Sequence, residues 1–356
     1  MIIMKAEATR EEVENVVREI KKYGLKADVS VGEFRTIIGL IGDETGVPFS
    51  RLALLPGVKE ARMVETPYKL ISKEYGQRFD EESGESRLVK VVDCQIGGDD
   101  LIFIAGPCAV ENKTQVFRIA EGIKKAGAQI LRGGVFKPRS SVHSFQGLGA
   151  NGTEGAEEAL SWLRAAGDKF GLAVVTEVRG ETQIDLVDKY VDMFQIGTRN
   201  MYDQDLLVGI ARKKKPILFK RHFGAGIDEF LGFAEYIAAE GNKDIVLCER
   251  GILPLGKGKN YTRYTFDLGS IPAIQKETYL PIVADPSHAI GRRDLIFNMS
   301  CAAIAAGASG LMLESHYNPA EALVDGQQMI TPEELKEVIE ACQQIRRVLA
   351  SRKNKQ

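Results

Sequence analysis

The run LIFIAGPC at residues 101–108 decides the fold, because it is a short apolar strand that ends in a glycine, a proline and a cysteine. Further apolar runs follow it, separated by longer stretches with helical periodicity such as KTQVFRIAEGIKKAG. These later runs are QILRGGVF (129–136), AVVTEV (173–178), MFQIGT (193–198), PILFK (216–220), DIVLCE (244–249), PIVADPS (281–287) and GLMLES (310–315). Eight strand-then-helix units predict an α/β fold, a (β/α)8 TIM barrel over residues 100–350.

An open, doubly wound parallel sheet is the other architecture that alternates strands with helices. It commonly carries a GxGxxG turn after its first strand, where a dinucleotide binds. No such turn follows residues 101–107. The closed barrel is therefore the favoured prediction.

Residues 1–65 predict a separate, small ferredoxin-like α+β domain. Strand-type runs alternate with one long amphipathic helix, EEVENVVREIKKYG, and one short helix candidate, LALL, in the order βαββαβ. The strand-type runs are MIIMKAE, KADVSVG, FRTIIGLIG and VKEARMVE. Residues 66–99 are polar around FDEESGES and read as a linker, in which RLVKVVDCQI is a strand candidate that packs on the barrel.

Composition excludes several classes of protein. With 44% hydrophobic and 27% charged residues, the chain can form a buried core and remain soluble. A net charge of −2 argues against a nucleic-acid or membrane surface as the main partner. No signal-peptide pattern and no run of about 18 apolar residues is present, so we expect a cytoplasmic protein. The five cysteines show no CxxC spacing, which indicates reduced thiols.

Reactive side chains gather at the ends of the predicted strands. In a barrel all these ends lie on one face, where the catalytic groups of this fold are found. The side chains at or just beyond the strand ends are Cys108, Arg132, Lys137, Arg139, Glu177, Arg199, Lys220, Arg250, Asp285, His288 and Glu314. Residues distant in sequence are thus expected to form one pocket.

Four residues form a candidate metal site: Cys108, His288, Glu314 and the later Asp325. A lone cysteine or histidine is more often a structural residue, but their joint placement at strand ends favours metal binding. A thiolate and an imidazole suit one divalent ion such as Mn²⁺, Fe²⁺, Co²⁺ or Zn²⁺. Two carboxylates balance its charge and leave a position open for a substrate oxygen.

Six cations form a second group on the same face. Any one of them is more often a solvated surface charge, but six gathered without an anion would repel one another. Guanidinium groups bind phosphate through two hydrogen bonds and lysine adds a point charge, so the group indicates an anionic ligand. The six are Arg132, Lys137, Arg139, Arg199, Lys220 and Arg250. A Schiff base on Lys220 is the less favoured alternative.

Taken together, the motifs closely resemble 3-deoxy-D-arabino-heptulosonate 7-phosphate (DAHP) synthase, type I-beta, in the subgroup with an N-terminal ferredoxin-like domain. The motifs are AGPC (105–108), LRGGVFKPRSS (131–141), SFQGLG (144–149), TEV (176–178), QIGTRN (195–200), CERG (248–251), DPSH (285–288), GRRD (291–294) and ALVDG (322–326). The resemblance implies the first step of the shikimate pathway. In that step phosphoenolpyruvate, erythrose 4-phosphate and water give DAHP and inorganic phosphate.

The resemblance also implies roles for individual residues. It implies that the metal ligands are the four residues named above. It assigns phosphoenolpyruvate to Arg132, Lys137, Arg199, Lys220 and Arg250, with Asp285 among the substrate-binding residues, and the aldose to Arg139 and Ser140. Glu177, with Lys137 nearby, is the candidate that positions water or moves its proton.

The chain departs from the family's usual motifs near the aldose end. The departing residues are Val142, His143, His222, Tyr264 and Ser315. A related synthase that joins phosphoenolpyruvate to arabinose 5-phosphate is therefore the alternative, although the KPR segment at 137–139 argues against it. A ligand-sensing barrel without catalysis is a further alternative, and the complete residue set argues against that.

The subgroup resemblance implies regulation and assembly as well. We expect residues 1–65 to bind tyrosine or phenylalanine as a feedback inhibitor, with a plain oligomerisation module as the alternative. The resemblance also implies a homotetramer.

Overall fold

The computed structural model divides the chain into two compact units, Met1–Gly84 and Glu85–Gln356. The residues that it describes are 1–32, 35–42, 44, 47–62, 67–73, 87–137, 143–256 and 261–353. Within these residues, no helix combines the length and the hydrophobicity that crossing a membrane requires.

The first unit is a four-stranded antiparallel sheet with strand order β2-β3-β1-β4, packed against helices. Its elements are β1 (Ile2–Met4), α1 (Arg10–Lys22), β2 (Lys26–Val31), β3 (Thr36–Ile41), α2 (Phe49–Leu52) and β4 (Val58–Ala61). This order of elements is the ferredoxin-like βαββαβ unit, as predicted. The short helix begins before the LALL run (52–55) that was expected to form it and includes only the first residue of that run, Leu52.

Helix α1 of the first unit begins and ends where its sequence indicates. Thr9 and Glu12 form a capping box at its start, and Lys21 and Lys22 complement the dipole at its end. Its buried residues, Val16 and Ile20, belong to the same apolar cluster as Ile38 of β3. The amphipathic pattern therefore places one face of the helix on the sheet.

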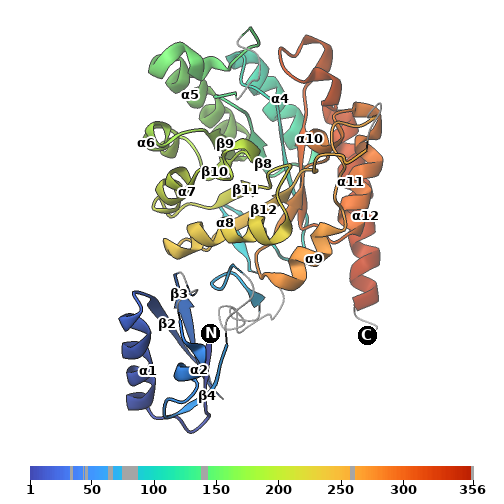
Figure 1. Cartoon of the computed structure of the whole chain (residues 1–356). Coiled ribbons are helices and arrows are strands. Elements are labelled where there is room, and N and C mark those ends of the chain that lie inside the picture. The colour runs from blue at the N-terminus through green and yellow to red at the C-terminus, as the bar shows by residue number, and fades with distance from the viewer. Residues whose placement is uncertain are drawn as a thin grey trace. The chain divides into compact units, whose positions relative to one another are not determined.

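The second unit is a closed, eight-stranded parallel barrel, in which β14 pairs with β7 to complete the ring (Figure 1). Its strands are β7 (Ile102–Gly106), β8 (Ile130–Arg132), β9 (Ala173–Val178), β10 (Met193–Ile196), β11 (Ile217–Lys220), β12 (Ile245–Glu249), β13 (Ile282–Ala284) and β14 (Gly310–Glu314). Every residue of these strands is buried, as expected for parallel strands between a filled interior and a layer of helices. The predicted barrel is confirmed and the open sheet is excluded.

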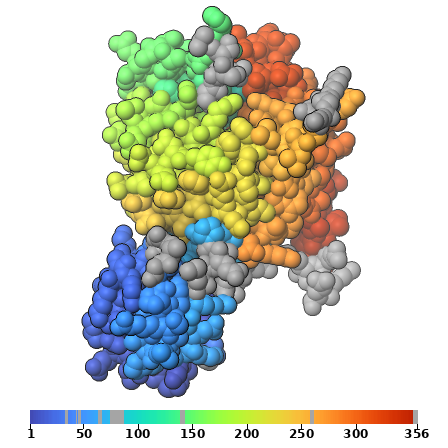
Figure 2. All heavy atoms as spheres, in the orientation of Figure 1, coloured from blue at the N-terminus to red at the C-terminus, as the bar shows by residue number. Residues whose placement is uncertain are grey.

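Helices surround the barrel, and in the space-filling view the residues of this layer form a continuous outer surface (Figures 1 and 2). The helices are α4 (Lys113–Ala126), α5 (Gly152–Phe170), α6 (Ile184–Asp188), α7 (Gln204–Ala211), α8 (Ile227–Ala239), α9 (Ser270–Glu277), α10 (Pro286–Ile290), α11 (Ile296–Ala305) and α12 (Pro332–Lys353). Short 3-10 turns follow several strands, among them Thr198–Asn200 and Gly326–Gln328.

Where one strand was predicted at RLVKVVDCQI, the structure has a hairpin of β5 (Val89–Val91) and β6 (Cys94–Ile96). The chain reverses at Val92, which has a positive φ of 53°. Val89 and Ile96 share an apolar cluster with the interior residues of the barrel. The hairpin therefore adds to the core of the second unit.

Candidate active site

The alternation of residues along each strand explains which side chains enter the site. One apolar layer fills the barrel interior. In seven of the strands, the residue two positions after a member of this layer points to the same side. These pairs are Ile130 and Arg132, Val175 and Glu177, Met193 and Gln195, Leu218 and Lys220, Cys248 and Arg250, Val283 and Asp285, and Met312 and Glu314. The polar group of residues thus lies above the apolar core at the carboxyl ends of the strands.

The structure brings the four predicted metal ligands together. One ligand atom from each of Cys108, His288, Glu314 and Asp325 lies within 4.8 Å of the others. The Cys108 Sγ lies 3.4 Å from an Asp325 oxygen, and the His288 Nε2 lies 3.3 Å from Glu314 Oε1. Asp325 reaches the group from a turn after β14 in which it has a positive φ of 55°.

Asp285 orients the histidine of this group. It caps α10 by accepting a hydrogen bond from the backbone N–H of His288, at 3.0 Å. Its carboxylate also lies 2.8 Å from His288 Nδ1, so that Nε2 is the nitrogen directed toward Glu314. Burial lowers the pKa of His288, which favours the neutral imidazole that binds metals.

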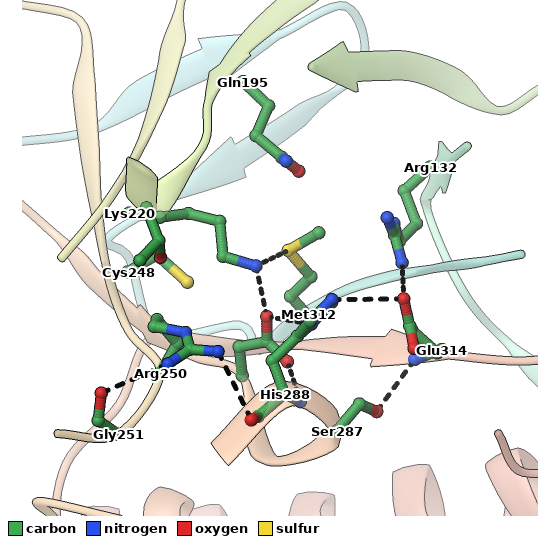
Figure 3. Close-up of polar contacts among 12 residues, drawn as sticks. Arg132, Gln195, Lys220, Cys248, Arg250, Gly251, Ser287, His288, Met312 and Glu314 are labelled. Carbon is green, nitrogen blue, oxygen red and sulfur yellow. Dashed lines mark hydrogen bonds and ion pairs between the residues drawn. The ribbon is translucent and has the colours of Figure 1, made fainter. Parts of the chain in front are cut away.

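The other ligands are held by polar neighbours. Glu314 accepts hydrogen bonds from Arg132 at 2.6 Å and from Gln328 at 2.5 Å. Figure 3 shows Arg132 and His288 directed at the Glu314 carboxylate from different elements. Lys137 Nζ lies 3.0 Å from Cys108 Sγ. Burial and the nearby Glu314 charge raise the pKa of the Cys108 thiol to about 12. The thiol therefore keeps its proton when no metal ion is bound.

Beside the four candidate ligands lies a cavity of about 150 Å³ with a largely cationic lining. The predicted cations that line it are Arg132, Lys137, Arg199, Lys220 and Arg250. All except Arg199 are buried. Arg139 and Ser140, predicted to bind the aldose, lie outside the described residues.

Asp285 does not line this cavity, although it was predicted to touch substrate. It is completely buried and lies 2.5 Å from Lys220 Nζ as well as against His288. It therefore links one cation of the cavity to one candidate metal ligand.

Glu177 lines the same cavity as Lys137. Gln195 donates a hydrogen bond to its carboxylate at 3.2 Å. A Cβ at position 197 would lie 1.9 Å from the Glu177 oxygen, so the carboxylate has room only because residue 197 is glycine. The sequence therefore provides a fixed carboxylate in the cavity wall.

Sequence reasoning missed several residues of the site. Gln195 could have been found, because it lies two positions after the inward-facing Met193. Arg263 lines the cavity from the loop after β12, donates a hydrogen bond to Gln328 at 3.3 Å and lies 4.0 Å from Asp325. Arg263 and Gln328 both lie in loops beyond the strands, where the alternation of residues along a strand gives no signal.

Comparison with known families places both units. A model described as "DAHP synthetase I family" matches residues 76–351, and one described as "DAHP synthase ferredoxin-like domain" matches residues 1–66. A Thermotoga maritima protein named phospho-2-dehydro-3-deoxyheptonate aldolase is 41% identical, covering 99% of this chain and all of that protein. A Syntrophobacter fumaroxidans protein named 2-dehydro-3-deoxyphosphooctonate aldolase is 31% identical, covering 73% of this chain and 92% of its own length.

Solved structures agree with these matches. The crystal structure of the Thermotoga maritima phospho-2-dehydro-3-deoxyheptonate aldolase (DAHP synthase) superposes with a TM-score of 0.74, covering 98% of this chain and 97% of that one. A truncated form of the 3-deoxy-D-arabino-heptulosonate 7-phosphate synthase from Thermotoga maritima is 39% identical, with a TM-score of 0.69. It covers 80% of this chain and 98% of its own.

Proposed function

Since the chain belongs to the DAHP synthetase I family, we propose that it is a metal-dependent synthase whose four candidate ligands hold one divalent ion. Its reaction condenses phosphoenolpyruvate with erythrose 4-phosphate and water, giving DAHP and inorganic phosphate. The observation that carries the metal proposal is the convergence of Cys108, His288, Glu314 and Asp325 beside the cationic cavity.

The donor set fits a divalent transition ion. A thiol, an imidazole and two carboxylates suit Mn²⁺, Fe²⁺, Co²⁺ or Zn²⁺ better than Mg²⁺ or Ca²⁺, which prefer all-oxygen sites. The orienting bond from Asp285 to His288 is the kind of neighbour that metal-binding histidines usually have. A bound ion supplies Lewis-acid polarisation of the aldehyde carbonyl.

The cavity residues bind and orient the substrates. Arg132, Lys137, Arg199, Lys220 and Arg250 hold the phosphate and carboxylate of phosphoenolpyruvate, which fixes its C3 facing the aldehyde carbon. C3 attacks that carbon, water adds at C2, and phosphate leaves from C2. Glu177, beside Lys137, positions the water and takes its proton.

A Schiff-base mechanism on Lys220 is not favoured. The amine lies 2.5 Å from the buried Asp285 carboxylate, whereas a nucleophilic lysine is typically activated in an apolar pocket without such a partner. Borohydride added with the keto-acid product DAHP should trap no adduct on Lys220.

The choice of aldose is tested by a substrate panel. With phosphoenolpyruvate and one added divalent ion, we expect phosphate release with erythrose 4-phosphate and little with arabinose 5-phosphate. The phosphooctonate-named relative does not favour arabinose 5-phosphate, because its identity is lower and its match covers only part of this chain. Turnover with arabinose 5-phosphate but not with erythrose 4-phosphate would refute the assignment.

The first unit is proposed to bind tyrosine or phenylalanine and to inhibit the barrel. The support is its match to the ferredoxin-like domain of DAHP synthases. The homotetramer implied by the family resemblance stays a prediction, which light scattering of the purified protein would test.

A further inference from the structure

Arg250 differs from Arg132 and Lys220, two other buried cations of the cavity, in having no carboxylate as an ion-pair partner among the described residues. Arg132 pairs with Glu314 at 2.6 Å and Lys220 pairs with Asp285 at 2.5 Å. Among the described residues, no carboxylate forms an ion pair with Arg250, although only 4% of this residue is exposed. Its guanidinium is therefore not paired directly with a carboxylate of these residues.

The hydrogen bonds of Arg250 are also weak for a buried guanidinium. It donates to the carbonyl oxygens of Gly251 and His288, each at the long distance of 3.4 Å. Its Nε is buried and has no hydrogen-bond partner among the described residues. Figure 3 shows the side chain extending from β12 toward the backbone of α10. Its two hydrogen bonds to the backbone therefore hold this side chain only weakly.

The guanidinium also contacts an aromatic ring. The Cζ of Arg250 lies 4.1 Å from the centroid of the Tyr264 ring. That ring stacks on Phe223, with centroids 5.6 Å apart and planes inclined by 20°. The backbone N–H of Tyr264 donates to the carbonyl of Ala289 in α10 at 2.8 Å. Tyr264 is thus fixed between the loop after β11 and the helix that carries His288.

We propose that Tyr264 is a positioning residue for substrate binding, which holds Arg250 by a cation–π contact and leaves its full charge free for an anionic group of phosphoenolpyruvate. A carboxylate in the same place would hold the guanidinium but would compete with the substrate anion and repel it. The negative face of a ring attracts the cation without adding a net charge. The inference rests on the proposed role of Arg250 in binding phosphoenolpyruvate.

Fluorination separates the electrostatic role of the ring at position 264 from its steric role. Phenylalanine and its mono-, di- and trifluoro analogues, placed at position 264, keep the ring's shape while they weaken its negative face. We expect the KM for phosphoenolpyruvate to rise stepwise along the series, by about tenfold in total, as a desolvated cation–π contact is lost. The kcat and the KM for erythrose 4-phosphate should change by less than about twofold, because the charge of Arg250 itself remains.

Substitutions in the holoenzyme complete the test. Tyr264→Phe should behave like the parent, and Tyr264→Leu should resemble the trifluoro variant. Tyr236→Leu is the matched control, because Tyr236 lies on α8 and is 40% exposed. Equal KM values across the fluorinated series would overturn the proposal, since the ring would then only fill space. Arg250→Ala with an unchanged KM would instead overturn the assignment of Arg250 to phosphoenolpyruvate.

Discussion

Asp285 holds His288 by two contacts, a hydrogen bond from the backbone N–H at 3.0 Å and a side-chain contact of 2.8 Å to Nδ1. One buried carboxylate therefore sets both the start of α10 and the direction of its imidazole. The contact between Asp285 and His288 can be weakened without replacing a proposed metal ligand, which allows the first prediction.

Asp285→Asn should lower the affinity for the divalent ion by about 10- to 100-fold, the usual cost of losing the partner of a metal-bound histidine. The amide keeps the size of the side chain but not its charge, so His288 is held less firmly. Competition with a fluorescent chelator measures the affinity. The exposed Asp294→Asn is the control, and an affinity unchanged by Asp285→Asn would contradict the proposed arrangement.

Removal of the metal should abolish turnover, and one equivalent of a divalent transition ion should restore it. Cys108→Ser should weaken metal binding by more than about 100-fold, because it removes a ligand rather than a ligand's neighbour. Elemental analysis after dialysis measures the retained metal. Cys94→Ser should retain metal like the parent, since Cys94 lies in the β5–β6 hairpin. Full activity in the presence of a strong chelator would rule out metal dependence.

Glu177→Gln should lower kcat by roughly 10²- to 10⁴-fold if this carboxylate takes the proton from water. The KM for phosphoenolpyruvate should change little, because the cations that bind it remain. Steady-state kinetics separates the two parameters. Glu181→Gln, just after β9, is the matched control. A variant that lost only substrate affinity would show that Glu177 does not act in proton transfer.

Arg221→Met should destabilise the barrel by about 3–5 kcal/mol, because it leaves the buried Glu249 without its partner at 2.9 Å. Burial already raises the pKa of Glu249, and loss of the guanidinium should raise it further. Stability carried by a raised carboxyl pKa is present at low pH and is lost as pH rises. The destabilisation should therefore be smaller at pH 5 than at pH 8.

The unfolding of this variant can be followed by the fluorescence of Trp162, the single tryptophan, which lies in α5 of the barrel. Arg212→Met is the control, because its pair with Glu240 is at the surface and contributes about 0–1 kcal/mol. Equal stability losses in the two variants would show that the buried pair has no special role.

Deletion of residues 1–65 should leave the synthase activity of the barrel and abolish inhibition by tyrosine or phenylalanine. A solved truncated form of the Thermotoga maritima synthase matches 80% of this chain. Inhibition curves of the two forms provide the measurement. Inhibition that survives the deletion would place the effector site in the barrel.

How much could be predicted from sequence depends on whether a residue lies near a strand end or in a recognisable motif. Lys220 and Glu314 end apolar runs, and parallel strands bring such ends to one face of the barrel. Their placement on that face could therefore be predicted. The contact of Arg263 with Gln328 joins two loops, and no local pattern determines how loops fold over one another. The same holds for the pair of Arg221 with Asp267. The β5–β6 hairpin was missed because Val92 gives no turn signal and takes a conformation unusual for a branched residue.

The closure of the barrel also determines when the proposed metal site can form during synthesis. Cys108 follows β7, whereas Glu314 ends β14, and these strands are neighbours only in the completed ring. A nascent chain that has not yet reached Asp325 lacks at least one of the four donors. Assembly of the complete proposed donor set is therefore tied to near completion of translation.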